Sequence, residues 1–144
     1  RQPLQDIASI TSHKRANKRT IDKAILEAYK HGISNFISGF AIGIDLMAAQ
    51  IVQSLKSSCP GMTLPAAIPF RGQADRFSAN DKIVYENLIA SADEVLILSE
   101  RYYTRCFLDR DEFMVENVSL LIAFYDGREE HTTLSRKPII WASP

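Results

Sequence analysis

The sequence predicts an α/β fold, a three-layer domain in which a mostly parallel sheet is covered by helices on both faces. Short apolar runs alternate with segments of helical periodicity through the whole chain, which is the pattern of successive strand–helix units. The chain has 144 residues, the length of one domain, and 46% of them are hydrophobic, enough for one continuous core. We therefore expect a single domain over residues 1–144, uninterrupted by repeats or low-complexity segments.

The first half of the chain alternates helix, strand, helix and strand, predicted over residues 17–31, 33–38, 44–56 and 62–70. The first helix has apolar residues at helical spacing and begins at Asn17, a favourable N-cap. The second helix is apolar on nearly every side, so it must be buried on more than one face. In the second strand, Pro65 has no N–H to donate to a ladder and therefore suits the start of the strand.

The second half continues with helix, strand, helix and two strands, predicted over residues 78–92, 94–98, 109–117, 120–124 and 138–141. Ser78 and Asp81 have capping-box spacing at the start of the first of these helices. Ligand sites in such sheets lie beyond the carboxyl ends of the strands. The loops expected at that edge are 39–43, 70–78, 99–108 and 125–137.

Composition excludes several classes of function. Lys and Arg together number 17, as do Asp and Glu, so a net charge of zero offers no global attraction to nucleic acid or to an anionic membrane. The basic run at residues 13–19 is expected to be a solvated loop and helix start. No apolar run approaches the ~20 residues that span a bilayer. We expect a soluble, cytoplasmic protein with neither a membrane nor a nucleic-acid partner.

No metal site is predicted. Cys59 and Cys106 lie far apart and belong to no Cys-x-x-Cys pair, and none of the three histidines has ligand spacing to a cysteine.

The segment SGFAIGIDLMAAQIV, residues 38–52, joins a strand to a helix through a glycine-containing loop. Gly39 and Gly43 could let backbone N–H groups cradle a phosphate, with Asp45 bonding a ribose hydroxyl. The alternative is a tight turn in which Asp45 caps the helix. The spacing is neither the dinucleotide fingerprint nor a P-loop, and an aspartate in the first turn would repel a phosphate placed directly on it. These residues leave both interpretations open.

Two further loops carry arginine beside aromatic residues. Arg71 and Arg76 accompany Phe70 and Phe77, which suits phosphate pairing and base stacking, or equally a solvated loop with Phe77 in the core. The same two interpretations apply to the segment with Tyr102, Tyr103 and Arg105.

The helix predicted after the second aromatic loop begins with two charged residues. Arg110 could reach over the sheet edge toward a ligand, while the negative charge of Asp111 would be stabilised by the positive end of the helix dipole. The pair could equally be only a charged first turn. Glu112 and Glu116 are expected on a solvated face.

Four motifs occur in one order along nearly the whole chain: Ser38-Gly39-x-Ala41-x-Gly43-x-Asp45, Pro69-Phe70-x-x-Gln73, Tyr103 leading to Arg110-Asp111-x-x-Met114-Val115, and Leu121-Ile122-Ala123-x-Tyr125-Asp126-Gly127. In this order they resemble the SLOG superfamily of Rossmann-like proteins, in the branch similar to the bacterial YpsA and YoqJ proteins. The resemblance implies binding or sensing of a nucleotide or nucleotide-derived small molecule, with no other cofactor and with homo-oligomerisation left open. The residues it places at the ligand are Ser38, Gly39, Ala41, Gly43, Asp45, Phe70, Gln73, Tyr103, Arg110, Asp111, Asp126 and Gly127.

More distant relatives, the lysine-decarboxylase-like phosphoribohydrolases, cleave N-glycosidic bonds. An alternative function is therefore a nucleoside-5′-monophosphate N-glycosidase in which Arg110 holds the phosphate. Those enzymes carry a glutamate after a Gly-Gly-Thr turn, which is absent here, so no catalytic residue is nominated. A third alternative is a non-catalytic interaction module whose partner surface contains Tyr102, Tyr103 and Phe77.

The sequence departs from the resembled family at two places. The family usually opens with a strand ending in a Thr-Gly-His-Arg-like motif, so we expect that strand upstream of Arg1. After Asp126-Gly127 the family commonly has Gly-Gly-Thr and a helix, whereas this chain has only the 13 residues 125–137 between predicted strands. A crossover with a helix needs roughly 10 to 12 residues, so this loop is expected to be remodelled or to lack residues.

Overall fold

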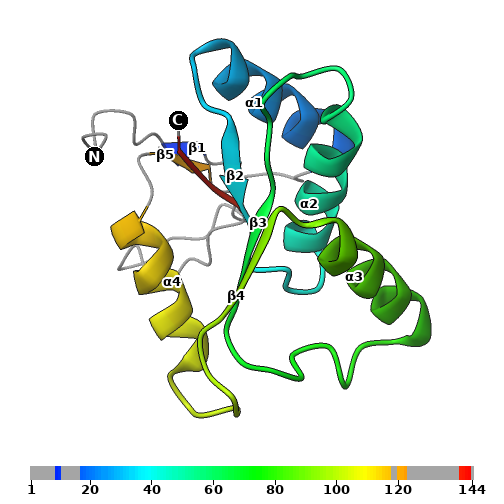
Figure 1. The fold of residues 1–144 in the computed structure, drawn as a ribbon, viewed down its shortest axis with the longest axis vertical. Coiled ribbons are helices and arrows are strands. Elements are labelled where there is room, and N and C mark those ends of the chain that lie inside the picture. The colour runs from blue at the N-terminus through cyan, green and yellow to red at the C-terminus, as the bar shows by residue number, and fades with distance from the viewer. Residues whose placement is uncertain (1–8, 11–16, 118–119, 123–139, 144) are drawn as a thin grey trace.

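A computed structural model describes residues 9–10, 17–117, 120–122 and 140–143, and these have the predicted α/β architecture (Figure 1). The helices are α1 (Lys18–Lys30), α2 (Ile44–Leu55), α3 (Ala79–Ser91) and α4 (Cys106–Asn117). The strands are β1 (Ser9–Ile10), β2 (Asn35–Ile37), β3 (Pro65–Ile68), β4 (Glu94–Ile97), β5 (Leu120–Ile122) and β6 (Ile140–Ser143).

The strands pair in two groups. Strands β3 and β4 form a parallel pair, and the other four lie in the order β1-β5-β6-β2. Isolated parallel bridges from Asn35 to Thr63 and from Ser38 to Ala66 bring β2 beside β3. Strand β1 is parallel to β5, whereas β6 is antiparallel to both of its neighbours. The described strands are therefore short. The pairs β1–β5 and β3–β4 are parallel, as predicted for a mostly parallel sheet, whereas β6 is reversed.

Local chemistry explains where several elements begin. The Asn17 side chain accepts a hydrogen bond from the Thr20 N–H at 3.0 Å, and the Asn17 N–H donates to the Thr20 hydroxyl at 3.1 Å, so α1 starts with a reciprocal cap. Ser78 accepts from the Asp81 N–H at 3.1 Å and caps α3. Strand β3 begins at Pro65, as predicted. Helix α4 begins at Cys106, three residues earlier than predicted.

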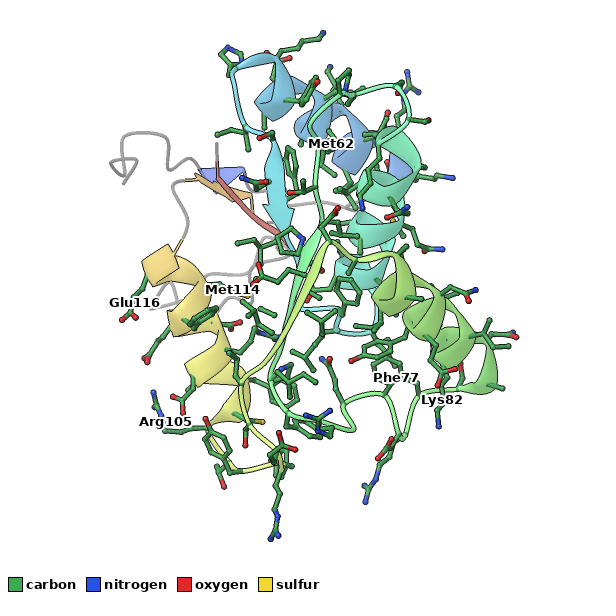
Figure 2. All side chains as sticks on the ribbon, in the orientation of Figure 1. Met62, Phe77, Lys82, Arg105, Met114 and Glu116 are labelled. Atoms are coloured by element: carbon green, nitrogen blue, oxygen red, sulfur yellow. The ribbon has the colours of Figure 1, made fainter. Side chains whose placement is uncertain are left out.

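Helices lie on both sides of the β2–β4 strands. Figure 1 shows α1, α2 and α3 on one side and α4 on the other. Phe36 and Leu64 belong to the larger core with residues of α1 and α2. On the opposite side, Met114 of α4 packs with Ala67. Figure 2 shows Met114 on the side of α4 nearer the strands and Glu116 on the outer side. As expected, α2 is buried broadly, at Leu46, Ala48, Ala49, Ile51 and Val52.

The carboxyl ends of β2, β3 and β4 point the same way, toward the lower end of Figure 1. The segments that follow these three strands therefore gather at one edge, whereas the fourth predicted loop, 125–137, falls outside the described residues. Within the described ranges, no helix combines the length and the apolar character that crossing a membrane requires.

Candidate functional site

The glycine loop between β2 and α2 is held by its own side chains. The Ser38 hydroxyl accepts from the Phe40 N–H at 3.1 Å and donates to the Asp45 carbonyl at 3.3 Å. The Asp45 carboxylate accepts from the Ala41 N–H at 3.3 Å. Phe40 and Gly43 have φ angles of +59° and +97°, which close the turn, and glycine adopts the second without steric cost. Asp45 thus occupies part of the loop that was predicted to face a phosphate or ribose.

Arg110 of α4 joins this loop from the other side of the sheet. Its Nη1 donates to the Gly39 carbonyl at 3.1 Å, and its Nε donates to the Asp111 carboxylate at 2.9 Å. Both charged side chains are only 3% exposed. A Cβ at Gly39 would lie 2.3 Å from Nη1. The contact therefore requires glycine. Arg110 reaches the loop after β2, and its predicted contact with a ligand stays a prediction.

A second side chain bonds the same carbonyl. Gln73 Nε2 donates to the Gly39 oxygen at 3.2 Å, and the Tyr85 hydroxyl donates to Gln73 Oε1 at 3.2 Å. Tyr85 thereby fixes the orientation of the amide. Burial, and secondarily the charge of Asp75, raises the pKa of Tyr85 to about 12. The hydroxyl consequently remains a donor throughout the physiological range.

An aromatic cavity of about 560 Å³ adjoins this network. Phe70 packs edge-on against Tyr102 and Phe107, at centroid distances of 5.5 and 6.1 Å. The Phe107 ring lies 5.8 Å from the Arg110 guanidinium carbon and so connects the cavity to the glycine loop. Such a volume suits a small molecule. The lining residues are Phe70, Gly72, Gln73, Asp75, Arg76, Tyr102 and Phe107.

Several charged residues near this edge are already paired. Arg71 makes two hydrogen bonds to Glu100, at 2.7 and 3.0 Å, and this pairing raises the pKa of Arg71 and lowers that of Glu100. Arg105 bonds Asp109 at 3.3 Å and Glu112 at 3.2 Å.

Tyr103 and Phe77 lie outside the cavity lining. Tyr103 donates to Asp109 at 2.6 Å, and this bond raises the pKa of the Tyr103 phenol. Phe77 packs against the larger core and edge-on against Tyr85, at a centroid distance of 5.4 Å, below α3 in Figure 2. Phe77 is thus partly buried against the core, as in the second interpretation, and a role in a partner surface stays a prediction.

The structure brings most of the sequence-predicted site residues to one edge. Gly39, Gln73, Arg110 and Asp111 form a connected hydrogen-bonded cluster, and Phe70 lines the cavity beside it. The loop holds Ser38, Ala41 and Gly43, and Asp45 lies in the first turn of α2. Asp126 and Gly127 fall outside the described residues. Contact of any of these residues with a ligand stays a prediction.

Three residues of the edge were missed by the sequence interpretation: Phe107, Tyr85 and Asp75, which lines the cavity. Phe107 precedes Arg110 by three positions, a spacing that places both on one side of a helix, but the helix was predicted to begin later. Tyr85 reaches the site only through Gln73, and no local pattern signals that contact.

A second cavity, of about 430 Å³, lies between α1 and α2. Its described lining residues are Lys18, Met47, Gln50, Ile51 and Ser54, none of which is aromatic. Elsewhere in the described ranges, no three His, Cys, Asp or Glu side chains gather as metal ligands.

Comparison with known proteins identifies related sequences. Residues 11–137 match the YpsA family model, described as the YspA SLOG family. A UPF0398 protein of Bacillus pumilus is 26% identical over 115 residues, covering 78% of this chain and 62% of that protein. The uncharacterised SPbeta prophage-derived protein YoqJ of Bacillus subtilis is 28% identical over 109 residues, covering 67% of this chain and 64% of that protein. The chain thus spans less than two thirds of the length of these relatives.

Proposed function

The chain belongs to the SLOG family that its residues 11–137 match, and we propose that it binds or senses a nucleotide or nucleotide-derived small molecule at the carboxyl edge of its Rossmann-like sheet. The observation that carries this proposal is the aromatic cavity beside the Gly39–Arg110 contact.

The cavity combines ring surfaces with directional polar groups. Phe70, Tyr102 and Phe107 supply aromatic surface from the segments after β3 and β4 and from α4. Base–aromatic stacking contributes about 1–3 kcal/mol per base. The Gln73 amide, which is buried and fixed by Tyr85, provides a polar group at the same wall. Apolar surface with a few fixed polar groups is typical of small-molecule sites.

A thermal-shift panel of nucleotides, ADP-ribose derivatives and nucleotide sugars tests the proposal. A ligand at ~100 times its dissociation constant adds about 2.7 kcal/mol to the free energy of unfolding. For a domain of this size we expect a rise of several degrees in Tm. No shift with any member of the panel would reject the proposal.

Two variants place the binding in the cavity. Tyr102→Ala removes a lining ring and should abolish most of the shift. Ile83→Ala is the matched control, because Ile83 on α3 is 57% exposed, comparable to 61% for Tyr102, and lies outside the lining. Assaying the same samples for free adenine released from AMP, against a mock-purified control, separates binding from the glycosidase alternative.

We further propose that the protein acts in the cytoplasm. Cys59 and Cys106 are both buried free thiols, as expected in a reducing compartment. Cell fractionation of a tagged copy tests this, and recovery in a membrane or secreted fraction would reject it.

A further inference from the structure

We propose that Arg76, at the wall of the aromatic cavity, binds the anionic group of the ligand, and that the glycine loop meets only uncharged parts of it. The inference rests on the proposed function. The anion is thus expected at Arg76 in the aromatic cavity and not at the glycine loop between β2 and α2.

The glycine loop is poorly disposed toward an added anion. The Phe40 N–H is bonded to the Ser38 hydroxyl at 3.1 Å, and the Ala41 N–H to the Asp45 carboxylate at 3.3 Å. Two donors of the turn are therefore engaged. A phosphate on this loop would also lie beside the carboxylate of Asp45, which is 8% exposed.

The charge of Arg110 is balanced within the protein. Its Nε bonds the Asp111 carboxylate at 2.9 Å and its Nη1 bonds the Gly39 carbonyl at 3.1 Å. Both side chains are 3% exposed, so the Arg110 charge is paired with the Asp111 carboxylate away from solvent. The guanidinium is thus committed to holding α4 against the loop.

Among the described arginines of this edge, Arg76 is the one that lines the cavity without a carboxylate partner, whereas Arg101 is exposed but is not among the lining residues. Arg76 is also solvent-exposed. Arg71 and Arg105 are bonded to carboxylates. Across the ranges that the structure describes, the Arg76 side chain makes no hydrogen bond or ion pair. A guanidinium in this state can pair with two phosphate oxygens at once.

The carboxylate of Asp75 lines the same cavity, and it is turned back over its own loop. Its Oδ2 lies 2.8 Å from the point that a Cβ at Gly72 would occupy. Asp75 repels an anion and attracts hydroxyl or amino donors. The cavity therefore has an arginine that can bind a phosphate and an aspartate that can bind a sugar hydroxyl or an exocyclic amine. A nucleoside monophosphate carries all of these groups.

Adenosine and AMP form a matched pair of probes because they differ only in the phosphate. We expect calorimetric titration at low salt to show AMP binding about 5-fold more tightly than adenosine, the gain of one exposed charge pair. In Arg76→Gln, the affinity for AMP should fall to that for adenosine, while the affinity for adenosine should not change. Arg71→Gln is the control, because it removes the same charge from a residue outside the lining. It should retain most of the preference for AMP.

A third variant distinguishes the two anion sites. Asp45→Asn removes the negative charge of the glycine loop and keeps an acceptor for the Ala41 N–H. The AMP-to-adenosine ratio should remain that of the wild type. A selective rise in AMP affinity in Asp45→Asn, or a full preference for AMP in Arg76→Gln, would place the phosphate on the loop and overturn the inference while the proposed function stands. Equal wild-type affinities would also overturn it. Failure of both probes to bind would overturn the inference, whereas the proposed function is rejected only when every other member of the thermal-shift panel fails as well.

Discussion

Arg110 lies so close to Gly39 that a Cβ on residue 39 would be 2.3 Å from the arginine Nη1. The hydrogen bond between Nη1 and the Gly39 carbonyl joins residues 71 positions apart. It ties the second turn of α4 to the loop after β2, and the same guanidinium contacts the Phe107 ring. The edge proposed to bind ligand is therefore assembled by a contact that only glycine permits.

Gly39→Ala should destabilise the fold by about 1–3 kcal/mol, because the added methyl group must displace a buried guanidinium. Urea unfolding measures the loss. The cost should decrease in an Arg110→Lys background, which lacks the clashing atoms. Gly32→Ala is the control: its φ of +99° imposes strain, but no heavy atom lies within 4 Å of the new Cβ, so its cost should be the same in both backgrounds. Equal costs of Gly39→Ala in both backgrounds would contradict the close contact.

Arg110→Met should cost about 3–5 kcal/mol, because it leaves the Asp111 carboxylate buried without the guanidinium. Arg105→Met removes an arginine that immediately precedes the same helix and whose side chain is 56% exposed, so its loss should be only about 0–1 kcal/mol. Comparing the two by urea unfolding tests whether the Arg110–Asp111 pair is as buried as the structure shows. Similar losses of unfolding free energy in both variants would show that the Arg110–Asp111 pair is not buried.

Alkaline pH should destabilise the protein through Tyr85. Burial and the charge of Asp75 raise the Tyr85 pKa from 10.0 to about 12 in the folded state. Between these values the unfolded chain loses the phenol proton and the folded protein retains it. The contribution of Tyr85 to stability is thus fully present below pH 10 and is lost as pH rises toward 12.

Tyr85→Phe should remove that component of the alkaline loss, and it should cost about 1 kcal/mol at neutral pH through the lost bond to Gln73. The tyrosinate absorbance of the wild type minus that of the variant isolates Tyr85 from the other tyrosines. A difference curve with its midpoint near the ordinary pKa of tyrosine would contradict the buried environment.

Acid pH should weaken the junction between β3 and β4 through Asp93. Partial burial raises the pKa of Asp93, but hydrogen bonds from Lys56 and the Leu64 N–H, each at 2.6 Å, outweigh it and lower the pKa below 3.8. The stabilisation is present above the unfolded pKa and is lost as pH falls through the folded one. Asp93→Asn should flatten the pH dependence of urea unfolding in the acid range. Glu94→Gln, at the neighbouring exposed position, should change it little.

The elements that were correctly predicted depend on neighbours in sequence. Asn17 caps α1 with Thr20, three residues away, and Pro65 begins β3 because it lacks an N–H. The direction of β6 could not be predicted in this way, since periodicity reports burial and not strand orientation. The unpredicted β1 has only two residues, too few for a pattern.

The site was predictable as a set of segments and not as a set of contacts. Motif order indicated that the Gly39 and Arg110 segments belong together, but it could not assign the Ala41 N–H to Asp45 instead of a ligand. The Asp45 carboxylate and a ligand phosphate could each accept from the Ala41 N–H, so only the folded geometry shows which of them does. Tyr85 escaped prediction because its contact with Gln73 depends on how α3 packs over the loop after β3.

Mapping of backbone amide chemical shifts on titration with AMP tests the central claim most directly, because it reports both binding and its place. We predict progressive shifts in residues 70–76 and 102–107, which surround the aromatic cavity, and none around Lys18 and Gln50 of the second cavity. Shifts confined to the second cavity, or their absence with AMP, ADP-ribose and nucleotide sugars alike, would contradict a nucleotide site at this edge.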